Sequence, residues 1–113
     1  GNLAQTLVAL GRAAEAEPLE RERLEASRRV LGAEHPRTLD AIGNLANTLY
    51  ALGRAAEAEP LERERLEASR RVLGVAHPGT LIAMGNLAAT LDALGRAAEA
   101  EPLERERLEA SRR

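Results

Sequence analysis

The sequence predicts an all-α protein in which antiparallel helix pairs stack side by side into an α-solenoid. Ala, Leu, Arg and Glu fill 74 of the 113 positions, and this composition strongly favours helix. The segment LGRAAEAEPLERERLEASRR begins at Leu10, Leu52 and Leu94, which gives a period of 42 residues. Each period contains two stretches with apolar residues at helical spacing. Because two helices cannot bury a Leu/Ala face alone, neighbouring units must supply the rest of the core.

The repeat divides one array, residues 1–113, into units 1–42, 43–84 and 85–113, the last of them incomplete. The first two units agree at 35 of 42 positions, and the third matches the second at 27 of 29. Recent duplication, design and selection for one repeated shape all explain such similarity. We expect the chain to be part of a longer array, or a subunit that meets others end to end.

The first helix of a unit is predicted from Thr38 to Leu52, with Thr38 as the N-cap. Gly53 is expected to end it in the left-handed conformation. At 100° per residue, one face of this helix is apolar and the opposite face is mostly polar. The apolar face carries Ile42, Leu45, Ala46, Leu49 and Leu52, and the opposite face carries Asp40, Gly43, Asn44, Asn47, Tyr50 and Ala51.

The second helix is predicted from Arg54 to Leu73, and Gly74 is expected to end it. His77 and Pro78 then open the turn into the next unit, because proline biases the residue before it away from helix. The two helices give a predicted core that recurs 42 residues away in each direction. It consists of Leu45, Ala46, Leu49, Leu52, Ala58, Leu61, Leu66, Val72 and Leu73 with their equivalents.

Composition argues against most kinds of chemistry. The net charge of −2 offers no attraction to nucleic acid or to an acidic membrane, and no apolar run is long enough to span a bilayer. The sequence contains neither Cys nor Lys, which removes thiolate nucleophiles, Schiff-base lysines and phosphate loops. His35 and His77 are expected to cap or pack against helix ends. We therefore predict no enzymatic activity, no cofactor and no metal, and a cytoplasmic location.

One set of residues recurs at fixed offsets in the units. In the middle of the chain it consists of Asn44-Leu45-Ala46, Leu49, Gly53-Arg54, Glu57-Ala58-Glu59-Pro60-Leu61, Leu66, Val72-Leu73-Gly74, His77-Pro78 and Thr80-Leu81. This pattern resembles the tetratricopeptide repeat, in its 42-residue kinesin-light-chain-like variety. The resemblance covers the whole chain and implies a right-handed superhelix whose first helices line a concave groove.

The chain departs from the family pattern at two positions of each second helix. Arg23, Arg65 and Arg107 stand where the family usually has a small Ala, and Glu20, Glu62 and Glu104 stand where it often has an aromatic residue. The long side chains either extend along the surface to solvent or mark a contact between subunits. For the second case, the candidate assembly surface is Arg23, Glu62, Arg65 and Arg107.

Only seven positions of the repeat vary, and three of them lie on the polar side of the first helix. The resemblance implies that this side binds peptides and that its recurring Asn holds the ligand backbone. On that interpretation Asn2, Asn44 and Asn86 hold the backbone, and Gln5, Val8, Asp40, Asn47, Tyr50, Ile82, Ala89 and Asp92 select side chains. Free drift on an exposed face is the other interpretation, although the exposed side of the second helix shows no variation.

Two functions remain open at this point. The first is a protein-interaction scaffold that binds an extended peptide or partner segment in the groove. The second is a self-assembling structural protein whose near-identical units form a filament or tube. The expected partner is a protein, a peptide or another copy of the chain, and neither nucleic acid nor a membrane.

Overall fold

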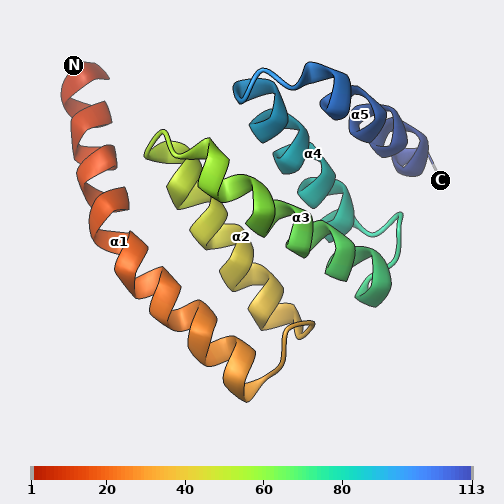
Figure 1. Cartoon of the computed structure of the whole chain (residues 1–113), viewed down its shortest axis with the longest axis horizontal. Helices are drawn as coiled ribbons and strands as arrows, with labels where there is room; N and C mark the ends of the chain where they lie inside the picture. Colours follow the sequence, from red (N-terminus) through yellow and green to blue (C-terminus); the bar gives the residue numbers. More distant parts are fainter. Residues whose placement is uncertain (1, 113) are drawn as a thin grey trace.

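The computed structural model describes the backbone of residues 2–112 and the side chains of residues 11–112. Within that range the chain forms five helices and no strand. Consecutive helices run in opposite directions and each packs mainly against its neighbours in the chain (Figure 1). The predicted all-α solenoid is confirmed. The helices are α1 (Asn2–Val30), α2 (Pro36–Ala51), α3 (Ala55–Val72), α4 (Pro78–Ala93) and α5 (Ala97–Ser111).

The turn before each first helix is held by histidine and threonine side chains. The backbone N–H of Arg37 donates to Nδ1 of His35 at 3.1 Å, so His35 is the N-cap of α2. Thr38 lies inside the first helical turn, and its hydroxyl donates to the carbonyl of Gly32 at 2.8 Å. The expected histidine cap is confirmed, and the predicted Thr38 cap is wrong because His35 already occupies that position. The same bonds recur 42 residues later, Gly79 N–H to His77 and Thr80 hydroxyl to Gly74.

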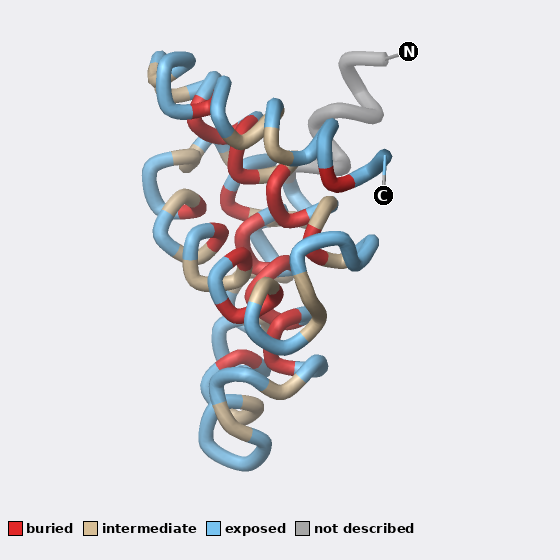
Figure 2. Tube along the Cα trace, turned by 90° about the vertical axis from the view of Figure 1, so that its right-hand side faces the viewer, coloured by how far each residue is buried: buried red, intermediate tan, exposed pale blue. Residues whose placement is uncertain are grey.

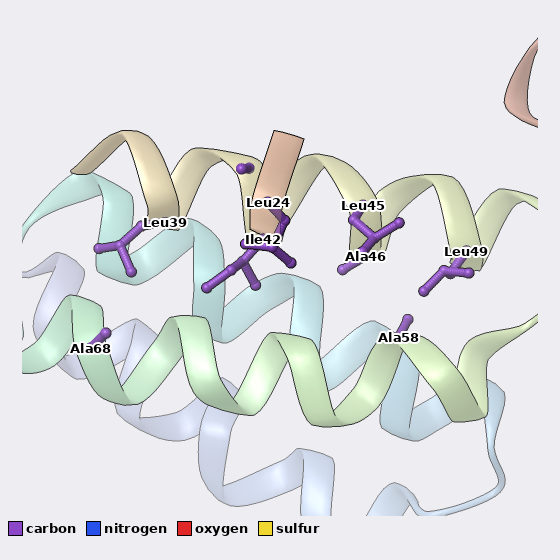
Figure 3. Packing of buried hydrophobic residues seen from close by; sticks show 9 residues of the cluster. Leu24, Leu39, Ile42, Leu45, Ala46, Leu49, Ala58 and Ala68 are labelled. Atoms are coloured by element: carbon purple, nitrogen blue, oxygen red, sulfur yellow. The ribbon is translucent and has the colours of Figure 1, made fainter. Parts of the chain in front are cut away.

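The core forms two clusters, one around each first helix. The first joins α1, α2 and α3 (Figure 3), and the second joins α3, α4 and α5. The buried stretches run through the middle of the array, while the turns stay exposed (Figure 2). Of the predicted core, Leu45, Ala46, Leu49, Ala58 and Leu66 are buried, and Leu52, Leu61 and Leu73 are partly buried.

Several predicted core positions are exposed, and the predictions for them are wrong. Val72 is 42% exposed, because the apolar stripe continues into the last turn of α3 while the packing does not. Leu19, Val30 and Leu31 on α1 and the turn after it are exposed, as is Leu108 on α5. No further unit covers the outer sides of α1 and α5 in the described structure, so these leucines and valines face solvent.

Residues 10–14 form continuous helix, unlike the identical segments 52–56 and 94–98. Gly53 and Gly95 have φ of 77° and 76° and break the chain into two helices, whereas Gly11 lies within α1. The expected helix pair in unit 1–42 is therefore one 29-residue helix. Tertiary contacts, and not local sequence alone, decide whether this segment turns.

The two conformations predict opposite effects of the same substitution. Gly53→Ala should lower the free energy of unfolding by about 1–2 kcal/mol, because an L-residue is strained at positive φ. Gly11→Ala should leave it unchanged or raise it by up to about 1 kcal/mol, because alanine favours helix. A Cβ at either position meets no atom within 4 Å, so a steric clash contributes to neither change in the free energy of unfolding. Chemical denaturation would measure both, and equal losses would show that residues 10–14 also turn.

Candidate functional site

A buried carboxylate lies at the junction between the two complete helix pairs. The side chain of Glu62 on α3 is only 4% exposed, and its Oε1 accepts a hydrogen bond from the hydroxyl of Thr90 on α4. The equivalent bond one unit earlier joins Glu20 on α1 to Thr48 on α2, at 2.5 Å. A carboxylate–hydroxyl bond thus ties α1 to α2 and α3 to α4, each time across the junction between two units.

Burial raises the pKa of Glu62 above its ordinary value, because the charged form loses hydration. The Thr90 hydrogen bond and the positive charge of Arg65 act in the opposite direction and lower it, but they do not cancel the effect of burial. The repulsion from Glu59 raises it slightly further. Glu62 is therefore a carboxylate whose negative charge is only partly compensated by the protein.

Ion pairs join successive second helices at their outer side. Arg28 on α1 contacts Glu64 on α3 at 2.7 Å, and the equivalent Arg70 on α3 contacts Glu106 on α5 at 2.7 Å. Two further pairs recur at each junction. They are Glu17–Arg54 (2.7 Å) and Arg21–Glu57 (3.6 Å), followed by Glu59–Arg96 (3.5 Å) and Arg63–Glu99 (3.3 Å). We call these six pairs the inter-unit ladder.

The ladder accounts for many charges of the repeated ERERLEASRR strip. The strip residues that pair between units are Arg21, Arg28, Arg63, Glu64, Arg70 and Glu106. In the ladder, Arg54 holds the pKa of Glu17 and Glu57 below the usual range, chiefly through hydrogen bonds. Arg96 does the same for Glu99. Because all three carboxylates are solvent-accessible, each pair is worth little on its own.

The candidate assembly residues do not share one surface. Glu62 is 4% exposed and its carboxylate faces Thr90 on α4, so it shares no exposed surface with Arg23 and Arg107, and its assignment to that surface is wrong. Arg65 is half-buried against α2, where a Cβ on Gly43 would lie 2.8 Å from its Cζ. Arg23 and Arg107 are exposed, and Arg107 pairs with Glu104 at 3.2 Å.

Next to Glu62 the first helices α2 and α4 enclose a small pocket of about 120 Å³. Four of its six lining residues were predicted from sequence to form the groove, and Glu62 and Thr90 complete it. The lining residues, which we call the inter-helix pocket, are Asn47, Tyr50, Glu62, Asn86, Ala89 and Thr90.

The other predicted groove residues lie outside this pocket. Asp40 and Asn44 on α2 and Ile82 and Asp92 on α4 are all exposed on the same two helices. Asn2, Gln5 and Val8 lie outside the residues whose side chains the structure describes. Asn44 and Asn47 are exposed and Asn86 is partly exposed, and none of the three side-chain amides makes a hydrogen bond to another residue among 11–112.

Sequence reasoning missed the part that Glu62 and Thr90 play in the pocket. The available signal was the recurrence of Glu where the family often has an aromatic residue, together with a Thr 28 positions after both Glu20 and Glu62. It also missed a cleft of about 610 Å³ between α3 and α5, which the ladder crosses at Arg63 and Arg70. A smaller cleft of about 250 Å³ occupies the equivalent place between α1 and α3.

No cluster of metal-binding side chains occurs among residues 11–112. In the part of the chain that the structure describes, every helix is too short or too polar to cross a membrane.

Thr90→Val should destabilise the protein by about 1–3 kcal/mol, because it leaves the buried Glu62 carboxylate without its donor. Thr48→Val is the matched control. It should cost less, because Glu20 is half-buried and water can replace the lost hydroxyl. Urea unfolding followed by circular dichroism would give both values. Equal losses would contradict a special cost for burying Glu62.

Comparisons with known proteins agree on one family. The sequence profile of the tetratricopeptide repeat matches residues 1–71 and 63–113. No curated protein sequence matches the chain. Among 26 chains of solved structures that match, one holds nearly identical TPR-like repeats of a protein described as a kinesin light chain of Podosopora anserina. It superimposes with a TM-score of 0.86 at 25% identity, over 97% of this chain and 54% of the other.

The chain therefore spans about half the length of that structure. The matched residues reach from one end of the sequence to the other, and the observed helix pairs repeat with the same 42-residue period. The chain belongs to the tetratricopeptide repeat family.

Proposed function

We propose that this array is a protein-interaction scaffold that binds an extended peptide or partner segment along α2 and α4. Repeats of this family generally mediate protein–protein interactions. The observation that carries the proposal is the inter-helix pocket, where Asn47 and Tyr50 of α2 meet Asn86 and Ala89 of α4. A ligand that entered this pocket would contact two successive first helices at once.

The free amides support an extended ligand. Asn44 and Asn86 stand at the same position of successive first helices, and neither is bonded within residues 11–112. An extended backbone presents N–H and C=O groups at regular intervals, and an amide can both donate to and accept from them. Two such amides at one repeat spacing would fix the direction and register of the ligand.

The positions at which the units differ also support peptide binding along α2 and α4. The three variable positions of the first helix are Asp40/Ile82, Asn47/Ala89 and Tyr50/Asp92, and all six residues are exposed. The ladder residues of the second helices do not vary between units. Fixed amides beside changeable neighbours are what a selective peptide groove needs.

A peptide selection would test this function. Immobilised protein should enrich extended peptides from a random library, and the Asn44→Ala/Asn86→Ala double variant should bind them at least about tenfold more weakly, since it loses two hydrogen bonds. The control is Glu67→Ala/Glu109→Ala, an exposed pair on α3 and α5 that is also one repeat apart. Unchanged affinity in the asparagine variant would refute the groove, provided that its helicity matches that of the wild type.

Self-association is the second candidate, and the charges at the two ends of the array favour it. On α5, Glu101, Arg105 and Arg112 are the equivalents of the α3 residues that reach forward in the ladder. On α1, Arg12, Glu15 and Glu22 are the equivalents of the residues that receive them. The two sets have opposite signs in matching order. An exposed apolar cleft of about 230 Å³, lined by Leu81, Ile82, Arg107, Leu108 and Ser111, lies beside α5.

Sedimentation velocity over a range of protein and salt concentrations would test head-to-tail association. If this candidate is right, the sedimentation coefficient rises with protein concentration at low salt, and Leu108→Glu abolishes the rise by placing a charge in the contact. Leu19→Glu at the opposite end should act in the same way. A constant monomer value at low salt would exclude assembly.

A further inference from the structure

We propose that the inter-helix pocket binds the ammonium group of a lysine side chain in the partner, with Glu62 as its counter-ion and Tyr50 as its aromatic wall. This inference rests on the proposed peptide-binding function and names the chemistry that the pocket selects. The pocket is small, lies between two first helices, and has a carboxylate from the second helix between them among its lining residues.

The Glu62 carboxylate has capacity for a further donor. Oε1 accepts from Thr90, and no arginine lies within 4.0 Å of either oxygen in the part of the chain that the structure describes. A carboxylate accepts about four hydrogen bonds, so one hydroxyl leaves most of its capacity unused. The raised pKa of Glu62 agrees with this geometry, because a group held in its charged form at a cost gains from a bound cation.

The remaining wall residues suit an ammonium group. Tyr50 is the only aromatic residue of the chain and is 44% exposed, which leaves part of its ring available to a cation. The amide oxygens of Asn47 and Asn86 are further acceptors. An ammonium carries three donors on one small atom and therefore matches several acceptors around a pocket of about 120 Å³. A guanidinium is larger and planar, and fits this arrangement less well.

The surrounding charges favour a cation on balance. Asp40 on α2 and Asp92 on α4 are exposed on the two helices that form the pocket walls. The opposing charges are Arg37, exposed in the first turn of α2, and Arg65, one turn beyond Glu62 on α3. Neither lines the pocket, and the guanidinium of Arg65 lies against Gly43 of α2. Arg65 therefore weakens the attraction without occupying the site.

The combination of a Glu–Thr pair with an aromatic residue beside it occurs once among the described units. The junction between α1 and α2 has the same carboxylate–hydroxyl pair, Glu20 and Thr48, but the position equivalent to Tyr50 is Val8 in the sequence. The next equivalent position is Asp92. A single lysine of the partner would thus be placed beside Tyr50, and this contact would set the register of the whole segment.

The test uses four alanine-based peptides that differ only in a central Lys, Arg, norleucine or Glu, with capped ends. Binding at millimolar concentrations is followed by amide chemical shifts of the labelled protein. The Lys peptide should bind about tenfold more tightly than the norleucine peptide of equal length, with the largest shifts at Tyr50 and Ala89. Glu62→Gln keeps the side-chain shape and an acceptor for Thr90 but removes the charge, and should reduce this ratio to near one.

Two further variants keep the outcome interpretable. Tyr50→Val introduces the residue found at position 8, leaves Glu62 in place, and should reduce the ratio several-fold. Glu67→Gln removes the same charge from an exposed position of α3 and should leave the ratio unchanged. Equal binding of Lys and norleucine peptides overturns the ammonium site but keeps the groove, whereas no binding of any peptide overturns the groove itself. Tighter binding of the Arg or Glu peptide overturns the lysine assignment, the latter in favour of Arg65.

Discussion

A helix pair made of Leu and Ala cannot cover its own apolar face, and the remainder of this structure follows from that constraint. Both core clusters are shared by three helices, two from one unit and one from its neighbour. The same dependence explains why equivalent leucines differ so widely, from the buried Leu66 to Leu108, which is 56% exposed. Stability in such an array is therefore a property of junctions between units. The carboxylate–hydroxyl bond and the inter-unit ladder are the polar contacts that align each junction.

The first unit shows what happens to local structure when part of this cover is absent. Residues 10–14 continue α1 as helix, while the same five residues make a turn at 52–56 and 94–98. Gly11 is compatible with either backbone, and alanine-rich flanks favour helix when nothing opposes it. In the later units, the turn allows the second helix to pack back onto the first, and the buried area offsets the loss of helical hydrogen bonds. The same five residues can thus form either a helix or a turn, and packing against neighbouring helices determines which of the two forms.

This balance explains how much the sequence could predict. Periodicity, glycines and the His-Pro turn were enough for the helix order and for the core around Leu45 and Leu49, because these signals are local or depend on one helical face. The single helix α1 and the exposure of Val72 could not be predicted, because each depends on which neighbouring helices are present. The Thr38 cap was wrong for a local reason, since His35 caps α2 three residues earlier. In the pocket, the varying positions drew attention to Asn47 and Tyr50, but the part played by Glu62 depends on a contact 28 residues away in the chain. A helical-wheel projection of one helix cannot show a contact with another helix.

The structure also separates the residues that hold units together from those free to vary. Apart from the Ile42/Met84 exchange, which is fully buried and close to volume-conserving, nearly all differences between units fall at exposed positions of the turns and first helices. Substitutions there leave both clusters and the ladder intact. Glu62 is the same in every unit but has two roles, since its carboxylate joins two units through Thr90 and also lines the pocket between their first helices. A ligand cation at that carboxylate would lower the cost of burying its charge, so binding in the pocket and the stability of that junction should be coupled.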